Sequence, residues 1–312
     1  MKRSTKPIIC CGFTPCVQRI LEFKKVEKGA VNRAVNATIG IGGKGANVAR
    51  MVSQLGSSAE LVEFVGGPNG RLLEKMLMAE GIGFRHLEVE GETRVCQTLL
   101  EEGGPDATEL VEEMPPISAS DWQRMLELFQ TLDLFGAVVA VSGKLPAGAP
   151  EEGYAVICQL VAEKGASVLL DTQGTPLLMA LPHRPMLVKI NEAELRAATG
   201  EAKLLDGCRR LRALGAQSVL ITRGSQPAFY MDDFQTVELV PPKIKAVNPI
   251  GSGDAVTAGI AVALNAGEPM GRAVVEGMAC GAANALNLLS GFLRPADVAR
   301  LKQEVVLQSV GE

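Results

Sequence analysis

The chain has 312 residues, of which 47% are hydrophobic and 21% are charged, an ordinary composition for a globular protein. This length suits a single large domain, residues 1–312, with a small appendage. The formal net charge is −4, so there is no basic surplus with which to bind a nucleic-acid backbone. No stretch is apolar for long enough to span a membrane, and the first apolar run is too short for a signal peptide.

The seven cysteines and two histidines follow no metal-binding or disulfide pattern. Cys10 and Cys11 are adjacent in an expected core strand, which favours buried thiols over metal ligands. Free thiols suit a reducing compartment, and we expect a cytoplasmic protein. His86 and His183 lie in no motif with a partner residue, which argues against a histidine-based hydrolase.

Two stretches in the first part of the chain interrupt an alternation of strands and helices. Residues 14–38 are polar at several points, which indicates strands with one solvated face. Within residues 84–116 no helix separates the strands expected at 93–100 and 107–112. We therefore expect both stretches to form a small inserted β-sheet that serves as a lid.

The rest of the chain predicts strands and helices in regular alternation. A capping box of Ser120 and Gln123 is expected to open a helix that ends at Asp133. The order of elements predicts a three-layer α/β/α fold with a mainly parallel sheet covered on both faces. Ligands in such folds bind at the carboxyl ends of the strands. The expected strands are 7–12, 59–65, 137–141, 167–171, 186–190, 218–222, 227–231 and 235–240. The expected helices are 44–55, 70–80, 120–133, 152–164, 175–180, 192–199, 206–214, 254–265, 270–289 and 295–307.

The stretch from Asn248 to Gly259 carries the strongest chemical signal in the sequence. Gly251 and Gly253, with Ser252 between them, allow the backbone to coil tightly around an anion. The residues that follow predict a buried helix, whose N-terminus directs unpaired N–H groups toward the glycines. Asp254 lies at the start of this helix, where a carboxylate can take a proton from an alcohol. The stretch favours phosphoryl transfer to a hydroxyl, and a capped helix with a glycine turn is the alternative.

A second glycine turn, at residues 42–47, also opens a helix. It lacks the spacing of a dinucleotide fingerprint and the ending of a P-loop, which argues against a nicotinamide-dependent oxidoreductase. The turn offers bare backbone at Gly43, a cation at Lys44 and an amide at Asn47, and this combination suits a polyol that bears an anion. The alternative is a helix cap with a surface lysine.

Polar residues also follow two later strands. Asn191 and Glu194 share a face at a helix start, where their oxygens suit a hydrated magnesium ion, although a plain N-cap explains them as well. Thr222 and Gly224 could hold nucleotide phosphates or form an ordinary turn. A phosphate on the substrate could be held by one or more of four cations, each of which could also be a solvated surface charge: Arg33, Lys44, Arg94 and Lys144.

Together these motifs resemble the signatures of the ribokinase-like carbohydrate kinases, the PfkB family. The resemblance covers nearly the whole chain. Two shorter runs, Val31-Asn32-Arg33 and Gly91-Glu92-Thr93-Arg94, look most like the tagatose-6-phosphate kinase and 1-phosphofructokinase branch. The three family motifs are Gly42-Gly43-Lys44-Gly45-x-Asn47, Asn191-x-x-Glu194 and Asn248-x-x-Gly251-Ser252-Gly253-Asp254.

The resemblance implies that ATP, with Mg²⁺, phosphorylates a hydroxyl of a sugar phosphate of the tagatose 6-phosphate or fructose 1-phosphate type. Asp254 would be the catalytic base. The lid could also pair two subunits into a homodimer. The anion hole would be formed by Gly251, Ser252 and Gly253. The sugar would contact Gly43 and Asn47, and its phosphate would contact Lys44 and Arg94. ATP would lie along Lys189, Asn191, Thr222, Gly224 and, near the adenine, Asn284; Asn191 and Glu194 would hold the metal through water.

The chain departs from the branch at two points. Gln18 ends the run Thr14-Pro15-Cys16-Val17-Gln18, where the branch carries an aspartate that binds sugar hydroxyls. Lys144 replaces a serine in Ser142-Gly143-Lys144-Leu145-Pro146. Because both changes fall in the expected acceptor site, a kinase for an unphosphorylated sugar or nucleoside is the first alternative. A non-catalytic sugar or nucleotide sensor on the same scaffold is the second.

Overall fold

The structure, a computed structural model, describes residues 6–103 and 107–310, and the statements below concern these residues. They form a ten-stranded main sheet and a separate four-stranded small sheet. In spatial order the main sheet contains β14 (Val306–Ser309), β13 (Thr236–Val240), β12 (Gln226–Met231), β11 (Val219–Arg223), β10 (Leu187–Asn191), β9 (Ser167–Asp171), β8 (Val138–Ser142), β1 (Ile8–Cys11), β4 (Ala59–Val65) and β5 (Gly83–Glu88).

Neighbouring strands from β5 to β11 are parallel, and β12, β13 and β14 continue the sheet with antiparallel pairs. Ile8 and Cys10 face one hydrophobic core, whereas Ile9 and Cys11 face the other. The strand is therefore apolar at every position, as expected for a parallel sheet that is buried on both faces.

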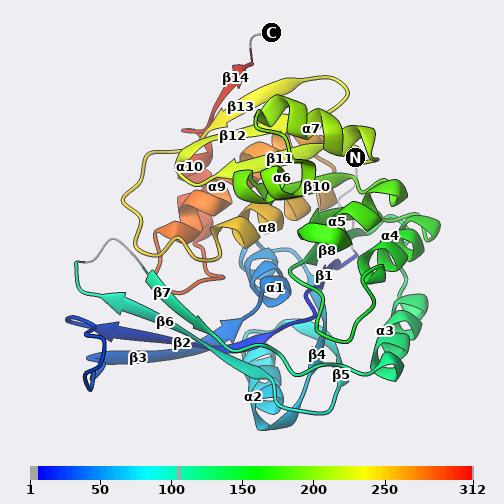
Figure 1. Cartoon of the computed structure of the whole chain (residues 1–312). Coiled ribbons are helices and arrows are strands. Elements are labelled where there is room, and N and C mark those ends of the chain that lie inside the picture. The colour runs from blue at the N-terminus through cyan, green and yellow to red at the C-terminus, as the bar shows by residue number, and fades with distance from the viewer. Residues whose placement is uncertain (1–5, 104–106, 311–312) are drawn as a thin grey trace.

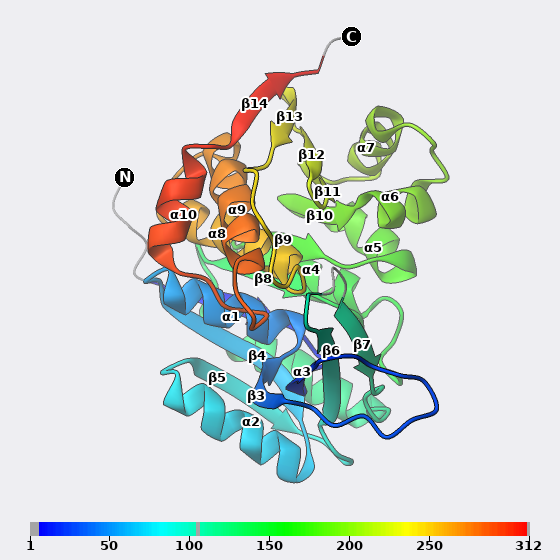
Figure 2. The same ribbon diagram turned by 90° about the vertical axis from the view of Figure 1, so that its left-hand side faces the viewer.

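Helices cover both faces of the main sheet, which confirms the three-layer α/β/α expectation (Figure 2). One layer contains α1 (Lys44–Gln54), α2 (Gly67–Ala79), α8 (Ser252–Asn265), α9 (Met270–Ala285) and α10 (Pro295–Lys302). The other contains α3 (Ala119–Thr131), α4 (Gly153–Glu163), α5 (Gly174–Ala180), the short 3₁₀ helix η1 (Leu181–His183), α6 (Glu192–Thr199) and α7 (Leu204–Ala213).

The small sheet projects from the main body beside the carboxyl ends of the parallel strands (Figure 1). Its order is β3 (Asn36–Gly42), β2 (Cys16–Phe23), β6 (Arg94–Glu101) and β7 (Ala107–Val111). The central β2 and β6 pair in parallel, and each outer strand is antiparallel to its neighbour. The chain thus enters this sheet at two separate points, as the sequence indicates.

Residues 84–88, which we expected in the small sheet, belong to β5 at the edge of the main sheet. They pair in parallel with β4, so α2 is the crossover helix between two parallel strands. The prediction grouped them with the later strands because no helix follows them. A buried polar contact supports the pairing, since His86 Nε2 lies 3.1 Å from Glu63 Oε1 on β4.

Three element boundaries also differ from expectation. The capping box of α3 is formed by Ser118 and Asp121, not by Ser120 and Gln123, because the aspartate accepts the N-cap backbone N–H at 3.0 Å. Helix α9 ends at Ala285 rather than at residue 289. Helix α10 ends at Lys302, and residues 306–309 pair with β13 as an edge strand, since the run of Val306 and Leu307 favours an extended chain beside a free sheet edge.

Within the described part of the chain, no helix combines the length and the apolar character needed to cross a membrane.

Candidate active site

A cavity of about 430 Å³ lies at the carboxyl ends of the parallel strands, between the main sheet and the small sheet. This is the edge at which ligands bind in such folds. The cavity brings together residues from both glycine turns, from the ends of β9, β10 and β11, and from the small sheet. The predicted site residues that line it are Gln18, Gly43, Lys44, Asn47, Arg94, Lys189, Asn191, Glu194, Thr222, Gly251, Gly253 and Asp254.

The turn that opens α8 depends on its two glycines. Gly251 has a φ of 81°, in the left-handed region that favours glycine. A Cβ on Gly253 would lie 3.0 Å from Lys189 Nζ, so a side chain there would displace the lysine. The turn therefore brings the first N–H groups of α8, which have no partners within the helix, to the cavity wall.

Asp254 lies in the first turn of α8 and is 5% exposed. Its Oδ2 accepts a 2.8 Å hydrogen bond from Asn47 Nδ2, in the first turn of α1. The two glycine turns thus open helices whose starts meet at this carboxylate. The carboxylate therefore shares the cavity with the turn at Lys44.

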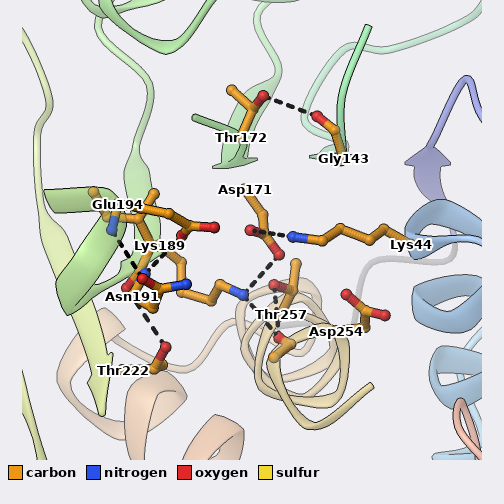
Figure 3. A network of polar contacts seen from close by, with 12 residues as sticks. Lys44, Gly143, Asp171, Thr172, Lys189, Asn191, Glu194, Thr222, Asp254 and Thr257 are labelled. Atoms are coloured by element: carbon orange, nitrogen blue, oxygen red, sulfur yellow. Dashed lines mark hydrogen bonds and ion pairs between the residues drawn. The ribbon is translucent and has the colours of Figure 1, made fainter. Parts of the chain in front are cut away.

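Asp171, the last residue of β9, joins two lysines across the cavity (Figure 3). Its Oδ1 lies 3.2 Å from Lys44 Nζ and its Oδ2 lies 2.7 Å from Lys189 Nζ. Lys189 Nζ also donates to Gly253 O at 3.1 Å, which fixes this ammonium group beside the glycine turn. Two cations are therefore held near Asp254 without a direct ion pair to it.

Burial and the surrounding charges together set the pKa values of these groups. Burial raises the pKa of the Asp254 carboxyl to about 6, although the charges of Lys44 and Lys189 and the Asn47 hydrogen bond oppose the rise. Burial acts to raise the pKa of the Asp171 carboxyl, but the two lysines hold it below its ordinary value. Partial burial acts to lower the pKa of the Lys44 ammonium, but the neighbouring carboxylates raise it overall. Asp254 is therefore the carboxyl of this group whose pKa lies closest to neutrality.

Asn191 and Glu194 form a reciprocal capping box at the start of α6. Asn191 Oδ1 accepts the Glu194 N–H at 2.9 Å, and Glu194 Oε2 accepts the Asn191 N–H at 2.8 Å. Both residues also line the cavity, and Glu194 Oε1 is not used by the capping box. The described residues contain no group of three or more histidine, cysteine or acidic side chains that could hold a metal ion. This donor set fits a Mg²⁺ ion that keeps its water shell, and it does not fit a protein cage.

Five predicted site residues are not brought to the cavity wall. The side chain of Ser252 turns toward Asn284, whose Nδ2 lies 3.4 Å from Ser252 Oγ and donates to Ile250 O at 2.9 Å. Asn284 is fully buried, so it braces the glycine turn from behind. The others are exposed: Gly224 in the β11–β12 turn, Lys144 after β8, and Arg33 in the β2–β3 loop.

Arg94 lines the cavity, but its guanidinium is largely occupied by backbone. Its Nη2 donates to Thr14 O at 2.8 Å, its Nη1 to Glu112 O at 3.0 Å, and its Nε to Pro15 O at 3.4 Å. Residues 14–15 lead from β1 into the small sheet, Arg94 itself begins β6, and Glu112 follows β7. The Arg94 side chain thus links three segments at which the chain passes between the main body and the small sheet.

Asp171, which pairs with both lysines, was not among the predicted site residues. It could have been found, because it ends a predicted strand at the sheet edge where ligands bind. The small sheet also contributes cavity residues whose positions depend on strand pairing, which the sequence does not reveal. These are Cys16, Cys96, Glu109 and Val111.

The chain is similar to known proteins over nearly its whole length. The model of the pfkB family carbohydrate kinases matches residues 12–295. A Staphylococcus aureus protein assigned as a phosphofructokinase is 27% identical, with a TM-score of 0.81, over 97% of this chain and 99% of its own. Phosphofructokinase-2 of Escherichia coli is 24% identical (TM-score 0.88; 96% and 98% covered). A Thermotoga maritima protein assigned as a 1-phosphofructokinase is 19% identical (TM-score 0.86; 98% and 100% covered).

The fold and the family match define a sugar kinase, a transferase that moves a phosphoryl group onto a hydroxyl. The chain belongs to the pfkB family of carbohydrate kinases, whose model matches most of its length.

Proposed function

We propose that the protein transfers the γ-phosphoryl group of ATP to a hydroxyl of a sugar phosphate of the tagatose 6-phosphate or fructose 1-phosphate type, giving a bisphosphate. The observation that carries this proposal is the position of Asp254. Its carboxylate is buried at the N-terminus of α8, hydrogen-bonded by Asn47 and flanked by two lysines. This arrangement combines a proton acceptor with donors for the charge that develops on the transferred group.

In the proposed reaction Asp254 accepts the proton of the attacking hydroxyl as the new O–P bond forms, which contributes roughly 10²–10⁴ to the rate. Asn47 orients the carboxylate through its 2.8 Å hydrogen bond. The N–H groups at Gly251 and Gly253 and the Lys189 ammonium stabilise the migrating phosphoryl charge, each anion-hole donor contributing about 3–4 kcal/mol.

The nucleotide is proposed to lie along the ends of β10 and β11, past Asn191 and Thr222, which line the same cavity. Glu194, with its free carboxylate oxygen, would hold Mg²⁺ through water. When bound, the metal would neutralise charge on the β- and γ-phosphates.

The phosphate of the acceptor is assigned to the side of the cavity that holds Lys44 and Arg94. A guanidinium has five N–H donors, and three carbonyls engage part of this set in Arg94, so donors remain for an anion. The names of similar proteins support this class, since a second structure of E. coli phosphofructokinase-2 contains fructose 6-phosphate and the S. aureus protein is assigned as a phosphofructokinase.

An unphosphorylated sugar or nucleoside is the second candidate acceptor. The engaged guanidinium of Arg94 favours it, because three carbonyls already take up part of the positive group that a phosphate would need. The neutral side chain of Gln18 is compatible with this candidate. A non-catalytic sensor would not need a buried carboxylate with a raised pKa among lysines, so we place that reading last.

The small sheet is proposed to act as a lid that excludes water from the phosphoryl group. Its exposed apolar side chains also support pairing of two copies through this sheet. They include Val31, Val35 and Ile39. One E. coli phosphofructokinase-2 structure is described as a tetramer, so a tetramer is the alternative to a dimer. The seven cysteines are all free, which suits a reducing cytoplasm.

A screen of ADP release would test the proposal, with fructose 1-phosphate, tagatose 6-phosphate, fructose 6-phosphate and the free sugars as acceptors. We expect turnover with at least one phosphorylated ketose and a loss of roughly 10²–10⁴ in kcat for Asp254→Asn, with ATP binding retained. Near-normal turnover of the variant would reject the role of Asp254. Turnover of free sugars alone would favour the second candidate.

A further inference from the structure

Three side chains form a row across the small sheet, on the face that looks into the cavity. Gln18 on β2 pairs with Cys96 on β6, and Cys96 pairs with Val111 on β7. Directly paired residues on neighbouring strands project to the same side. All three residues line the cavity that Asp254 also lines, so this row forms part of the wall that the small sheet contributes.

This row has little capacity to bind a hydroxyl. Gln18 Nε2 already donates to the buried Thr98 Oγ1 at 2.7 Å, and Gln18 Oε1 lies 3.7 Å from Cys16 Sγ. The Cys96 thiol is a weak donor and a weak acceptor, and Val111 has no polar atom. Val111 is nevertheless 52% exposed, which leaves an apolar side chain open to the cavity.

Charged groups flank the row. Arg94 lies two residues before Cys96 on β6, and Glu109 lies two residues before Val111 on β7; both also line the cavity. On the opposite wall, Asn47 and Asp254 supply polar atoms for the reacting hydroxyl. The cavity wall therefore lacks hydrogen-bonding partners only at the centre of the small sheet, where it would meet one edge of the bound sugar phosphate.

We propose that the row of Gln18, Cys96 and Val111 selects a deoxy-sugar phosphate as the phosphoryl acceptor. In this acceptor, the carbon that meets the centre of the row carries no hydroxyl. This inference rests on the proposed function. A hydroxyl pressed against Cys96 and Val111 would lose its hydrogen bonds to water without gaining comparable ones, whereas a methylene would bury apolar surface. An apolar pocket of this kind discriminates against an added hydroxyl by a factor of about 100 at most.

The test compares kcat/KM for pairs of sugar phosphates that differ by one hydroxyl. Suitable pairs are ribose 5-phosphate with 2-deoxyribose 5-phosphate, and fructose 6-phosphate with its 3-deoxy and 4-deoxy forms. For the wild-type protein we expect the deoxy member of at least one pair to be favoured by about 10- to 100-fold. Val111→Thr keeps the shape of the side chain and adds a hydroxyl, so it should reduce this preference by at least about five-fold.

Leu110→Thr is the matched control, because Leu110 is the preceding residue of β7, is 51% exposed, and projects to the opposite face. It should leave the preference unchanged. Gln18→Glu is a second variant. It places a carboxylate in the row, and this hydrogen-bond acceptor should also favour the hydroxylated member of each pair. A wild-type preference for the hydroxylated member of every pair would overturn the inference, as would equal shifts in Val111→Thr and Leu110→Thr. Absence of ADP release with every acceptor would instead overturn the proposed function.

Discussion

Asn47 and Asp254 are 207 residues apart in sequence, yet the amide of one donates a 2.8 Å hydrogen bond to the carboxylate of the other. This bond joins the starts of α1 and α8, the helices that follow the two glycine turns. It also stabilises the charged form of a carboxyl group that burial would otherwise neutralise. The protonation of Asp254 can therefore be used to test the proposed chemistry.

The first prediction concerns the pH dependence of the wild-type enzyme. A base must be unprotonated to accept a proton, and burial raises the pKa of Asp254 to about 6. We expect kcat/KM to be constant above neutrality and to fall about tenfold per pH unit below pH 6. Steady-state kinetics between pH 4.5 and 8.5 would measure this limb. A profile without an acidic limb above pH 5 would contradict the role assigned to Asp254.

The second prediction uses two variants that should move this limb in opposite directions. Asn47→Ala removes a hydrogen bond to the charged carboxylate, so the pKa of Asp254 should rise and the limb should move to higher pH. Asp171→Asn removes a neighbouring negative charge and releases Lys44 and Lys189 toward Asp254, so the limb should move to lower pH. Both variants should lose activity at their optimum. Shifts of the same sign in both would show that another group controls the limb.

The third prediction is that Asp254→Asn stabilises the fold at high pH. The folded-state pKa is raised from 3.8 to about 6, so the charged carboxylate costs up to about 3 kcal/mol above pH 6. This cost declines as pH falls through 6 and disappears below about 4. Urea unfolding should show the variant to be more stable than the wild type at pH 8, with a smaller difference at pH 5. An equal difference at every pH would mean that burial of charge is not its cause.

The sequence predicted those parts of the site that depend on local chain geometry. Asp254 and Asn47 were found because each follows a glycine turn at a helix start, and helix geometry fixes where such residues point. Asp171 was missed because a single aspartate at a strand end has no local motif. Its place at the end of a predicted strand was the one signal in the sequence. Its pairing with Lys189 at 2.7 Å depends on β9 lying beside β10.

The small sheet shows which features could not be predicted from the sequence. Its existence was predicted from two stretches without helices, but the pairing of Cys96 with both Gln18 and Val111 depends on register between distant segments. Register is set by cross-strand packing and by turn geometry, so it cannot be read from the sequence of each strand alone. The assignment of β5 failed for the same reason, because its partner β4 lies beyond a helix.

The fourth prediction is that Arg94 holds the small sheet in position as well as contributing charge. Arg94→Lys keeps the positive charge, but a single ammonium group cannot bridge the carbonyls of Thr14, Pro15 and Glu112. We expect a higher KM for the acceptor and more ATP hydrolysis relative to phosphotransfer, since a loosened sheet admits water. Arg19→Lys is the control, because Arg19 is exposed on the other face of β2. If Arg94 acts only as a charge, lysine will preserve most activity without added hydrolysis.

The fifth prediction concerns the buried contact that attaches β5 to the main sheet. His86 lies 3.1 Å from both Glu63 and Glu74, and its ring stacks on Phe84 with centroids 4.2 Å apart. Burial acts to lower the pKa of His86, but the two carboxylates raise it overall, and burial raises the pKa of Glu63. Because the folded-state pKa of His86 is raised, its contribution to stability is complete below its unfolded value of 6.5 and is lost as pH rises through the folded value.

Removing the imidazole leaves the Glu63 carboxylate buried without its cationic partner. We expect His86→Leu to lower the free energy of unfolding at pH 7 by about 3–5 kcal/mol, the usual effect of breaking a buried ion pair. The double variant Glu63→Gln/His86→Leu should recover a large part of this loss at pH 7, because it also removes the unpaired carboxylate. Urea unfolding at pH 7 measures the difference. If the single and the double variant are equally unstable at pH 7, the unpaired carboxylate is not the source of the loss, and the packing of His86 against Phe84 is what holds β5 in place.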